Sequence, residues 1–276
     1  MIRIKRSILG LILFFSACSL FAQGNLLVTP VRVIFENGKM REDLNVSNIG
    51  RDTAVYMASF LHYTMLQDGS FRELAKTDTT IAFADDYLRI FPRRVTLAPN
   101  ESQVIRVQFR KPADMKPGEY RSHLYFRAEK DVMPLGVKDP KIDSTKMAVR
   151  ITPIFGISIP VIIRNGNLNM KIRLSDVSLS SVNDSVARLK VSINREGERS
   201  SYGNLKVTYV PDKGKSIEVG QANGIGVYTE LKKRDFVMLL QLKNGLKLMS
   251  GKLVLRYVSP DEDGNKEYAK TEYKLQ

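Results

Sequence analysis

Hydrophobic and polar residues alternate along most of the chain. Runs with a period of two, rich in Val, Ile, Tyr and Phe, are separated by turn sequences such as ENGK, LQDGS and KPG. Alternation of this kind is typical of β-strands with one buried face. In the first part of the chain it predicts strands at 26–35, 42–48, 54–65, 88–97, 102–110, 119–128 and 147–163. Seven short strands over about 140 residues are typical of an immunoglobulin-like sandwich.

A second series of alternating segments follows the sequence RNGN at 164–167, which is the natural connection between two domains. This series predicts strands at 168–181, 185–194, 204–210, 216–220, 225–230, 236–242, 251–258 and 266–275. No segment repeats its apolar residues with the period of a helix for long enough to require one. The sequence therefore predicts an all-β protein with two immunoglobulin-like β-sandwich domains, at 23–164 and 165–276.

The first 22 residues differ from the rest. A basic start, MIRIKR, precedes the continuous apolar stretch SILGLILFFSACSLF. This pattern predicts a secretory signal peptide at 1–22, after which no integral membrane segment is expected. The alternative is a lipoprotein cleavage site at FSAC, which would leave Cys18 lipidated. Cys18 is the only cysteine of the chain, so the exported domains must rely on their hydrophobic cores instead of disulfides.

The chain is basic, with a formal net charge of +14. Loss of Arg3, Lys5 and Arg6 with the leader lowers this charge by three, to +11. A basic surface can indicate nucleic-acid binding, but an exported protein seldom meets nucleic acid, and the basic residues are scattered through the strands. We expect no nucleic-acid partner. An anionic partner, the envelope surface or a simply solvated face each account for the charge.

The sequence carries no recognisable catalytic or metal-binding motif. Its two histidines, His62 and His123, lie in separate strand patterns among aromatic residues. A Ser-His-Asp site needs a histidine held between a carboxylate and a nucleophile, and no G-x-S-x-G sequence is present. The acids Asp85 and Asp86 and the sequence PDEDGN lack a complete calcium loop. We therefore predict no enzyme activity, no metal site and no cofactor.

The segment LLVTPVRVIF has two faces if it forms a single strand. One face would carry Leu27, Thr29, Val31, Val33 and Phe35. The other would carry Leu26, Val28, Pro30, Arg32 and Ile34. Arg32 is thus a permanent cation among apolar residues. It either reaches the rim of the sheet or forms a structural ion pair, or its planar guanidinium binds a carboxylate that arrives from outside.

The predicted strand 147–163 is unusually long, because at about 3.3 Å per residue it would reach roughly 60 Å. Apolar residues occupy every odd position, and no charge lies between 151 and 163. Pro153 and Pro160 lack a backbone donor, which places the segment at a sheet edge. Such an edge needs a cover, either a partner strand or the loop at 129–146. The alternative is a strand that closes its own sandwich.

Several segments resemble the PapD-like periplasmic chaperones of pilus assembly. They are TPVRVIFENGK, FPRRVTLAPNESQVIRVQFRKP, GEYRSHLYFR and the long strand that ends in IIR. The resemblance covers about 26–164, while the second domain is similar only in size, position and strand content. It implies a boomerang arrangement of the two domains, a periplasmic location, and binding of pilus or fimbrial subunits by donor-strand complementation. An outer-membrane usher and a self-capping dimer are further partners that it implies.

The resemblance also implies roles for individual residues. Arg32 would anchor the carboxylate of the subunit, and Arg164 would be a structural residue between the domains. The implied donor strand comprises Ile151, Pro153, Phe155, Ile157 and Ile159. Two positions depart from the family. Pro160 stands where the family has a cleft lysine, so a second anchoring residue is not identified, and Arg121 stands where we would expect the acidic partner of Arg164.

Two other functions fit the same sequence. A structural cell-surface or adhesin-type protein could also be built of β-sandwich domains, and a lipidated Cys18 would favour it. A carbohydrate-binding module is the third option. The chain contains no Trp, however, and therefore lacks the side chain that is best suited to stacking on sugars.

Overall fold

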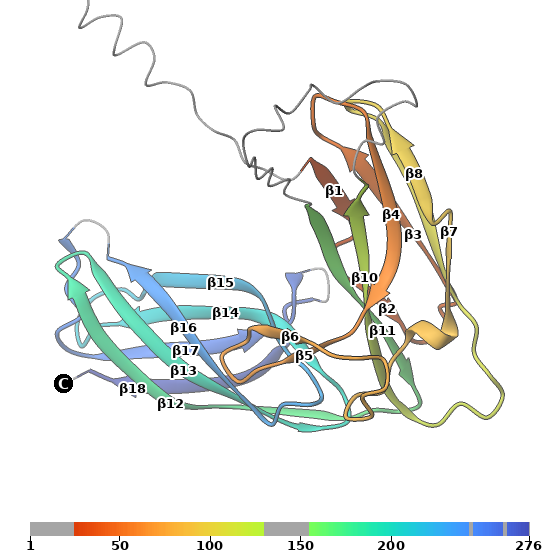
Figure 1. Ribbon diagram of the computed structural model, residues 1–276. Coiled ribbons are helices and arrows are strands. Elements are labelled where there is room, and N and C mark those ends of the chain that lie inside the picture. The colour runs from red at the N-terminus through yellow and green to blue at the C-terminus, as the bar shows by residue number, and fades with distance from the viewer. Residues whose placement is uncertain (1–24, 130–154, 243–244, 262–263, 276) are drawn as a thin grey trace, which may run out of the picture.

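The computed structural model describes residues 25–129, 155–242, 245–261 and 264–275. These residues form two β-sandwiches that meet at an angle, as Figure 1 shows. The described ranges contain no α-helix, and the 3-10 turn η1 (Asp85–Tyr87) precedes β7. The predicted fold class is confirmed, because alternating apolar residues supply one buried face to nearly every strand.

The first sandwich is made of two sheets. One has the strand order β1-β3-β9-β7, and the other has the order β2-β11-β10-β4-β8. The strands of the first sheet are β1 (Leu26–Thr29), β3 (Arg41–Asn48), β9 (Ser102–Phe109) and β7 (Leu88–Phe91). Those of the second are β2 (Val33–Phe35), β11 (Gly156–Asn165), β10 (Gly118–Ala128), β4 (Ala54–Leu61) and β8 (Arg94–Leu97). Leu44, Leu97, Ile105 and Phe126 are among the core residues between them.

The second sandwich packs a sheet of order β12-β13-β16 against one of order β15-β14-β17-β18. The strands of the first are β12 (Met170–Asn183), β13 (Val186–Gly197) and β16 (Lys233–Gln241). Those of the second are β15 (Ile217–Val227), β14 (Ser201–Val210), β17 (Lys252–Val258) and β18 (Glu267–Lys274). Leu189, Ile193, Leu205 and Tyr257 lie in its core. The predicted strands 216–220 and 225–230 are a single strand, β15, because its register shifts against β14 without ending.

The predicted strand 26–35 is divided between the two sheets of the first sandwich. Its first half, β1, pairs antiparallel with β3, whereas its second half, β2, pairs parallel with β11. Leu26, Val28, Val33 and Phe35 are all buried, so the buried positions change from even to odd at the crossing. The prediction of one face that continues through 26–35 was therefore wrong. Arg32 lies at this crossing.

The described part of the predicted strand 147–163 is β11. It pairs with β10 along its whole length, but with β2 only at residues 161–163. There the strand closes its own sandwich, as the alternative interpretation required. At residues 156–160 β11 has no second strand beside it within the described chain, so this half is an edge. Residues 147–154 lie outside the described residues.

A hairpin links the first sandwich to the second. Its strands β5 (Tyr63–Met65) and β6 (Phe71–Glu73) form a separate two-stranded sheet, which lies against the second sandwich in Figure 1. The Met65 N–H donates to Glu230 over 2.7 Å. The Asp235 N–H donates to the Gln67 carbonyl, also over 2.7 Å. The sequence pattern predicted β5 as the end of a longer strand and did not predict β6.

Candidate functional site

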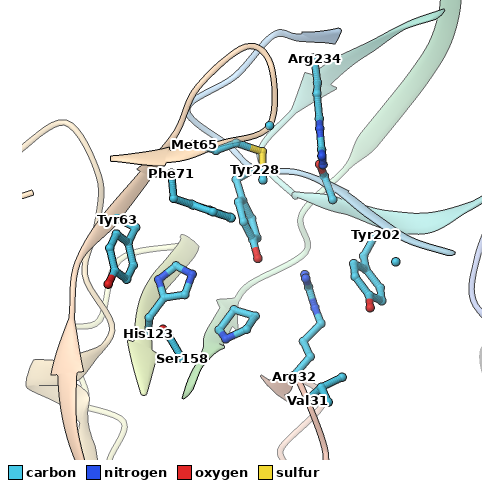
Figure 2. Close-up of a pocket in the computed structure, with 14 residues that line it drawn as sticks. Val31, Arg32, Tyr63, Met65, Phe71, His123, Ser158, Tyr202, Tyr228 and Arg234 are labelled. Atoms are coloured by element: carbon cyan, nitrogen blue, oxygen red, sulfur yellow. The ribbon is translucent and has the colours of Figure 1, made fainter. Parts of the chain in front are cut away.

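A cavity of about 520 Å³ lies between the two sandwiches and the β5–β6 hairpin. Figure 2 shows the side chains that point into it. The residues that decide its chemistry are Arg32, His123 and Pro160 of the first sandwich, Tyr63 and Phe71 of the hairpin, and Tyr202, Tyr228 and Arg234 of the second. Cations and aromatic rings therefore dominate the lining, and we find no carboxylate among the residues that line the cavity.

Arg32 enters the cavity from the crossing between β1 and β2. Its guanidinium carbon lies 4.4 Å from the centre of the Tyr202 ring and 5.7 Å from that of Tyr228. Its Nε and Nη2 atoms are buried and have no hydrogen-bond partner in the described chain. The rings stabilise the charge, but buried N–H groups without an acceptor are costly. The structural ion pair considered for Arg32 is not formed by the described residues, and an acceptor from outside would complete the site.

Arg234 supplies a second cation to the same cavity from β16. One terminal nitrogen donates to the Gly226 carbonyl, while the buried Nε finds no acceptor in the described ranges. Burial lowers the pKa of Arg234 from its ordinary value. Sequence reasoning missed this residue, because a basic residue at the start of a strand is unremarkable. Only the packing of the second sandwich brings it into the cavity.

Arg121 lies near the cavity but is paired. Its Nη1 and Nη2 donate to the two carboxylate oxygens of Glu230 over 3.0 and 2.7 Å. Nη2 also donates to the Tyr63 carbonyl over 2.8 Å, and the guanidinium stacks 3.8 Å from the centre of the Tyr228 ring. The side chain is only 3% exposed. Arg121 therefore joins β10 to the second sandwich instead of awaiting a ligand.

Arg164 is also paired. Its Nε donates to Glu119 over 3.0 Å and its Nη1 to Glu36 over 3.1 Å. Glu119 stands directly opposite Arg164 in the β10–β11 pair and accepts the Ser200 N–H of the second sandwich over 3.0 Å. The acidic partner that the sequence analysis sought at position 121 is thus Glu119. Arg164 thus connects β10 and the segment after β2, and through Glu119 it is linked to the second sandwich.

His123 adds no charge to the cavity. Burial, together with the nearby positive charges of Arg121 and Arg32, lowers its pKa to about 3. The imidazole is therefore neutral at physiological pH and behaves as one more ring of the lining. His62 lies outside the cavity, and its Nε2 is 2.9 Å from Oδ1 of Asp85. The described residues hold no group of three or more side chains that could bind a metal ion.

The predicted donor residues fall into three groups. Ile151 and Pro153 lie outside the described residues. Phe155 precedes β11 and is 55% exposed. Ile157 is partly buried against the core of the first sandwich, and Ile159 is a member of that core at 3% exposure. The expectation that Ile159 offers its side chain to a partner is therefore not met. What β11 leaves open at residues 156–160 is its backbone.

The open backbone and the unpaired cation are adjacent. Strand β2 begins at Val33, directly after Arg32, and pairs with β11 from Val161 onward. Arg32 therefore marks the place where the partner strand of β11 stops and the open flank begins. Ser158 and Pro160 of that flank line the same cavity as Arg32. The open flank of β11 and the buried donors of Arg32 thus meet at the same cavity.

No family model matches the chain, and no curated protein matches it. Among solved structures the chain is similar to CfaA, a chaperone of class 5 fimbriae, at 13% identity over 91% of this chain and 99% of that chain, with a TM-score of 0.45. It is also similar to the CupB2 chaperone of Pseudomonas aeruginosa, at 12% identity over 90% and 99% of the two chains, with a TM-score of 0.40.

A third similar structure is the SafB chaperone of Salmonella enterica, solved in complex with the SafA pilin. The identity is 14% over 92% of this chain and 97% of that chain, with a TM-score of 0.38. All three of these similar proteins are chaperones. Matches at such low identity and TM-score do not establish a function, which is therefore argued from the site. The described part of the chain contains no helix that is long and apolar enough to cross a membrane.

Proposed function

We propose that this protein is an exported periplasmic chaperone that binds pilus or fimbrial subunits without catalysing a reaction. One observation carries the proposal: the buried, unpaired donors of Arg32 stand at the end of the unpaired flank of β11. The first feature suits a carboxylate and the second suits an extended backbone. The carboxyl terminus of a polypeptide strand offers both at once.

The anchoring chemistry follows from the guanidinium group. A carboxylate has two acceptor oxygens, and Nε and Nη2 of an arginine point in nearly the same direction, so the pair can form two parallel hydrogen bonds. Arg234 faces the same cavity with a buried, unpaired Nε. We assign it the part of the second anchoring cation, which the sequence left unidentified. A contact to a charged group contributes about 1.5–3 kcal/mol, so it fixes the position of the chain while strand pairing and apolar contacts add affinity.

The direction of the bound strand also follows from the site. Arg32 lies at the Pro160 end of the open flank, so a chain whose carboxyl terminus reaches Arg32 passes Gly156 first and Pro160 last. It would run parallel to β11, in line with the parallel strand β2. Its side chains on the core side would cover Ile157, which is only partly buried. Such a strand would continue the sheet where β2 leaves it open.

Photo-cross-linking in the native envelope tests this proposal. Phe155 (55% exposed, beside the open flank) is replaced by the photoreactive residue p-benzoylphenylalanine, and Phe91 (78% exposed, on the edge strand β7) serves as the matched control. We expect position 155 to capture a second polypeptide close to its carboxyl terminus, as mass spectrometry of the cross-link would show. Arg32→Met in the same background should reduce the yield about tenfold or more.

Equal cross-linking from both positions would overturn the proposal, and so would a yield that Arg32→Met leaves unchanged. A ladder of this chain cross-linked to further copies of itself would instead favour the structural surface protein. Arg106→Met is the matched arginine control, because Arg106 pairs with Asp43 on the surface of the first sandwich and does not line the cavity. That variant should capture as much partner as the unmodified chain.

A further inference from the structure

The cavity around Arg32 has an aromatic wall that carboxylate binding alone does not require. Tyr63, Phe71, His123 and Tyr228 contact one another, mostly edge to face. The centre of the His123 ring lies 5.0 Å from the centre of the Tyr63 ring and 5.6 Å from that of the Phe71 ring. Phe71 in turn lies 6.0 Å from Tyr228. Figure 2 shows these rings on one side of the cavity, with Arg32 and Tyr202 pointing into it from the other.

The wall consists of rings, and the cavity beside it is not filled by neighbouring side chains. Its polar atoms are the hydroxyls of Tyr63 and Tyr228 and the ring nitrogens of His123, whose buried Nδ1 has no hydrogen-bond partner among the described residues. His123 is neutral at physiological pH because burial lowers its pKa. Glycines at 69, 224 and 226 also line the cavity. A methyl group placed on Gly226 would approach no atom closer than 3.7 Å, the Ser201 carbonyl oxygen, and would lie 4.0 Å from the Tyr228 ring, so there is room for an atom beside that ring. A pocket that is mostly aromatic with few polar groups is typical of a site for an apolar side chain.

The short distance between the wall and Arg32 indicates which residue of a bound polypeptide would place its side chain against the rings. It is the last residue. The terminal carboxylate and the side chain of the last residue are attached to the same Cα. A carboxylate that accepts hydrogen bonds from Arg32 lies about 3 Å from its nitrogen atoms, and the Tyr228 ring centre is only 5.7 Å from the guanidinium carbon. The side chain of the last residue is therefore within reach of the Tyr228 ring and of the wall behind it. Four rings arranged edge to face offer a fifth ring the geometry that aromatic pairs prefer.

We propose that the cavity recognises the last side chain of the bound polypeptide and selects chains that end in phenylalanine or tyrosine. This inference rests on the proposed function, since it places the terminal carboxylate at Arg32. It adds a specificity pocket, formed by Tyr63, Phe71, His123 and Tyr228, to the carboxylate anchor. The two sandwiches and the β5–β6 hairpin each contribute to the pocket, so the full chain is needed to form it.

Binding of defined peptides tests the inference separately from the proposed function. The probes are nine-residue peptides of alternating Thr and Val with an amino-terminal fluorophore and a last residue of Phe, Ala or Asp. Each is made with a free carboxylate and with a carboxamide, and fluorescence anisotropy gives the Kd. We expect the Phe peptide with a free carboxylate to bind about tenfold or more tightly than the Ala peptide, from burial of the ring.

The outcomes separate the two claims. If the Phe and Ala acids bind equally and both lose affinity as amides, the aromatic pocket is overturned while the carboxylate anchor stands. If the amides bind as tightly as the acids, the anchor itself fails. Tightest binding by the Asp peptide would also overturn the pocket, because Arg234 would then be taking a second carboxylate in place of a ring.

Two variants of the full chain sharpen the result. Phe71→Ala removes an exposed ring of the wall and should bring the Phe-to-Ala ratio of affinities close to one. Phe91→Ala is its matched control on β7, outside the cavity, and should leave the ratio unchanged. Gly226→Leu fills the space beside the rings and should weaken binding of the Phe peptide more than binding of the Ala peptide. Thermal unfolding of each variant shows whether it remains folded, and an unchanged ratio in a folded Phe71→Ala protein contradicts the inference.

Discussion

Arginine lines the junction between the two sandwiches in two different settings. Around Arg164, acids from β10 and from the segment after β2 accept its hydrogen bonds, and Glu119 is further bound to the second sandwich through Ser200. Around Arg32, the surroundings are aromatic, and no described residue accepts a hydrogen bond from its Nε or Nη2. Guanidinium nitrogens are buried in both settings, but only Arg164 has carboxylates beside it.

The difference separates arginines that hold elements together from the binding role that we propose for Arg32. A buried cation with acidic partners holds elements together, and its removal leaves the acids unpaired. A buried cation without partners does little for stability, because its desolvation is not compensated. The protein therefore carries a cost at Arg32 and Arg234 that an anionic ligand would offset. Arg121 belongs to the paired class, although it lies close to the cavity.

The largest effect is expected for Arg121→Met. This change leaves Glu230, whose side chain is 10% exposed, without its cation at the contact between β10 and the second sandwich. We expect a loss of about 3–5 kcal/mol in the free energy of unfolding, measured by urea denaturation followed by circular dichroism. The double variant Arg121→Met/Glu230→Gln should regain part of it, since no unpaired charge then remains. A loss below about 1 kcal/mol in the single variant would show that the pair is not structural.

An intermediate effect is expected on the pH dependence of stability, through His123. In the unfolded chain its pKa is 6.5, whereas in the folded chain it is about 3. Between these values the unfolded state binds a proton that the folded state does not, so stability falls as the pH decreases. From pH 7 to pH 5 the contribution is roughly 2 kcal/mol.

The His123→Gln variant should lack this part of the pH dependence, while the unmodified chain retains it. Urea denaturation at pH 7 and pH 5 measures the difference. Arg121, Arg32, Tyr63 and Tyr228 face the imidazole, and the two cations favour its neutral form. Identical pH dependence in the two proteins would mean that His123 is protonated in the folded chain near its ordinary pKa.

The smallest effect on stability is expected for Arg32→Met. Methionine retains the apolar stem and removes donors that have no partner among the described residues. We expect the free energy of unfolding to change by less than about 1 kcal/mol, in either direction. The same variant should lose partner capture in the cross-linking experiment, so that binding and stability separate. A loss comparable to that of Arg121→Met would assign Arg32 to the paired, structural class.

The alternation of apolar residues was sufficient to predict the fold class, because the buried face of a strand is a local property. It failed at 26–35 and at 88–97, where the structure has two strands in different sheets in place of one, since no local pattern indicates that a chain crosses from one sheet to the other. Arg32 could be selected as a candidate from the sequence, because a cation in an apolar segment is conspicuous. Glu119 and Arg234 could not, because their positions depend on strand register and on the packing of the second sandwich.

The parallel strand β2 would determine the register in which a bound polypeptide strand pairs with β11. It occupies the flank of β11 from Val161 onward, so an arriving strand cannot advance past that residue. Polypeptides of any length would then be aligned from their last residue, and a shift by two residues would force either the terminus into β2 or the carboxylate away from Arg32. The short strand β2 would thus fix which residues of the bound strand face which residues of β11, although it would contact only the carboxyl terminus of that strand.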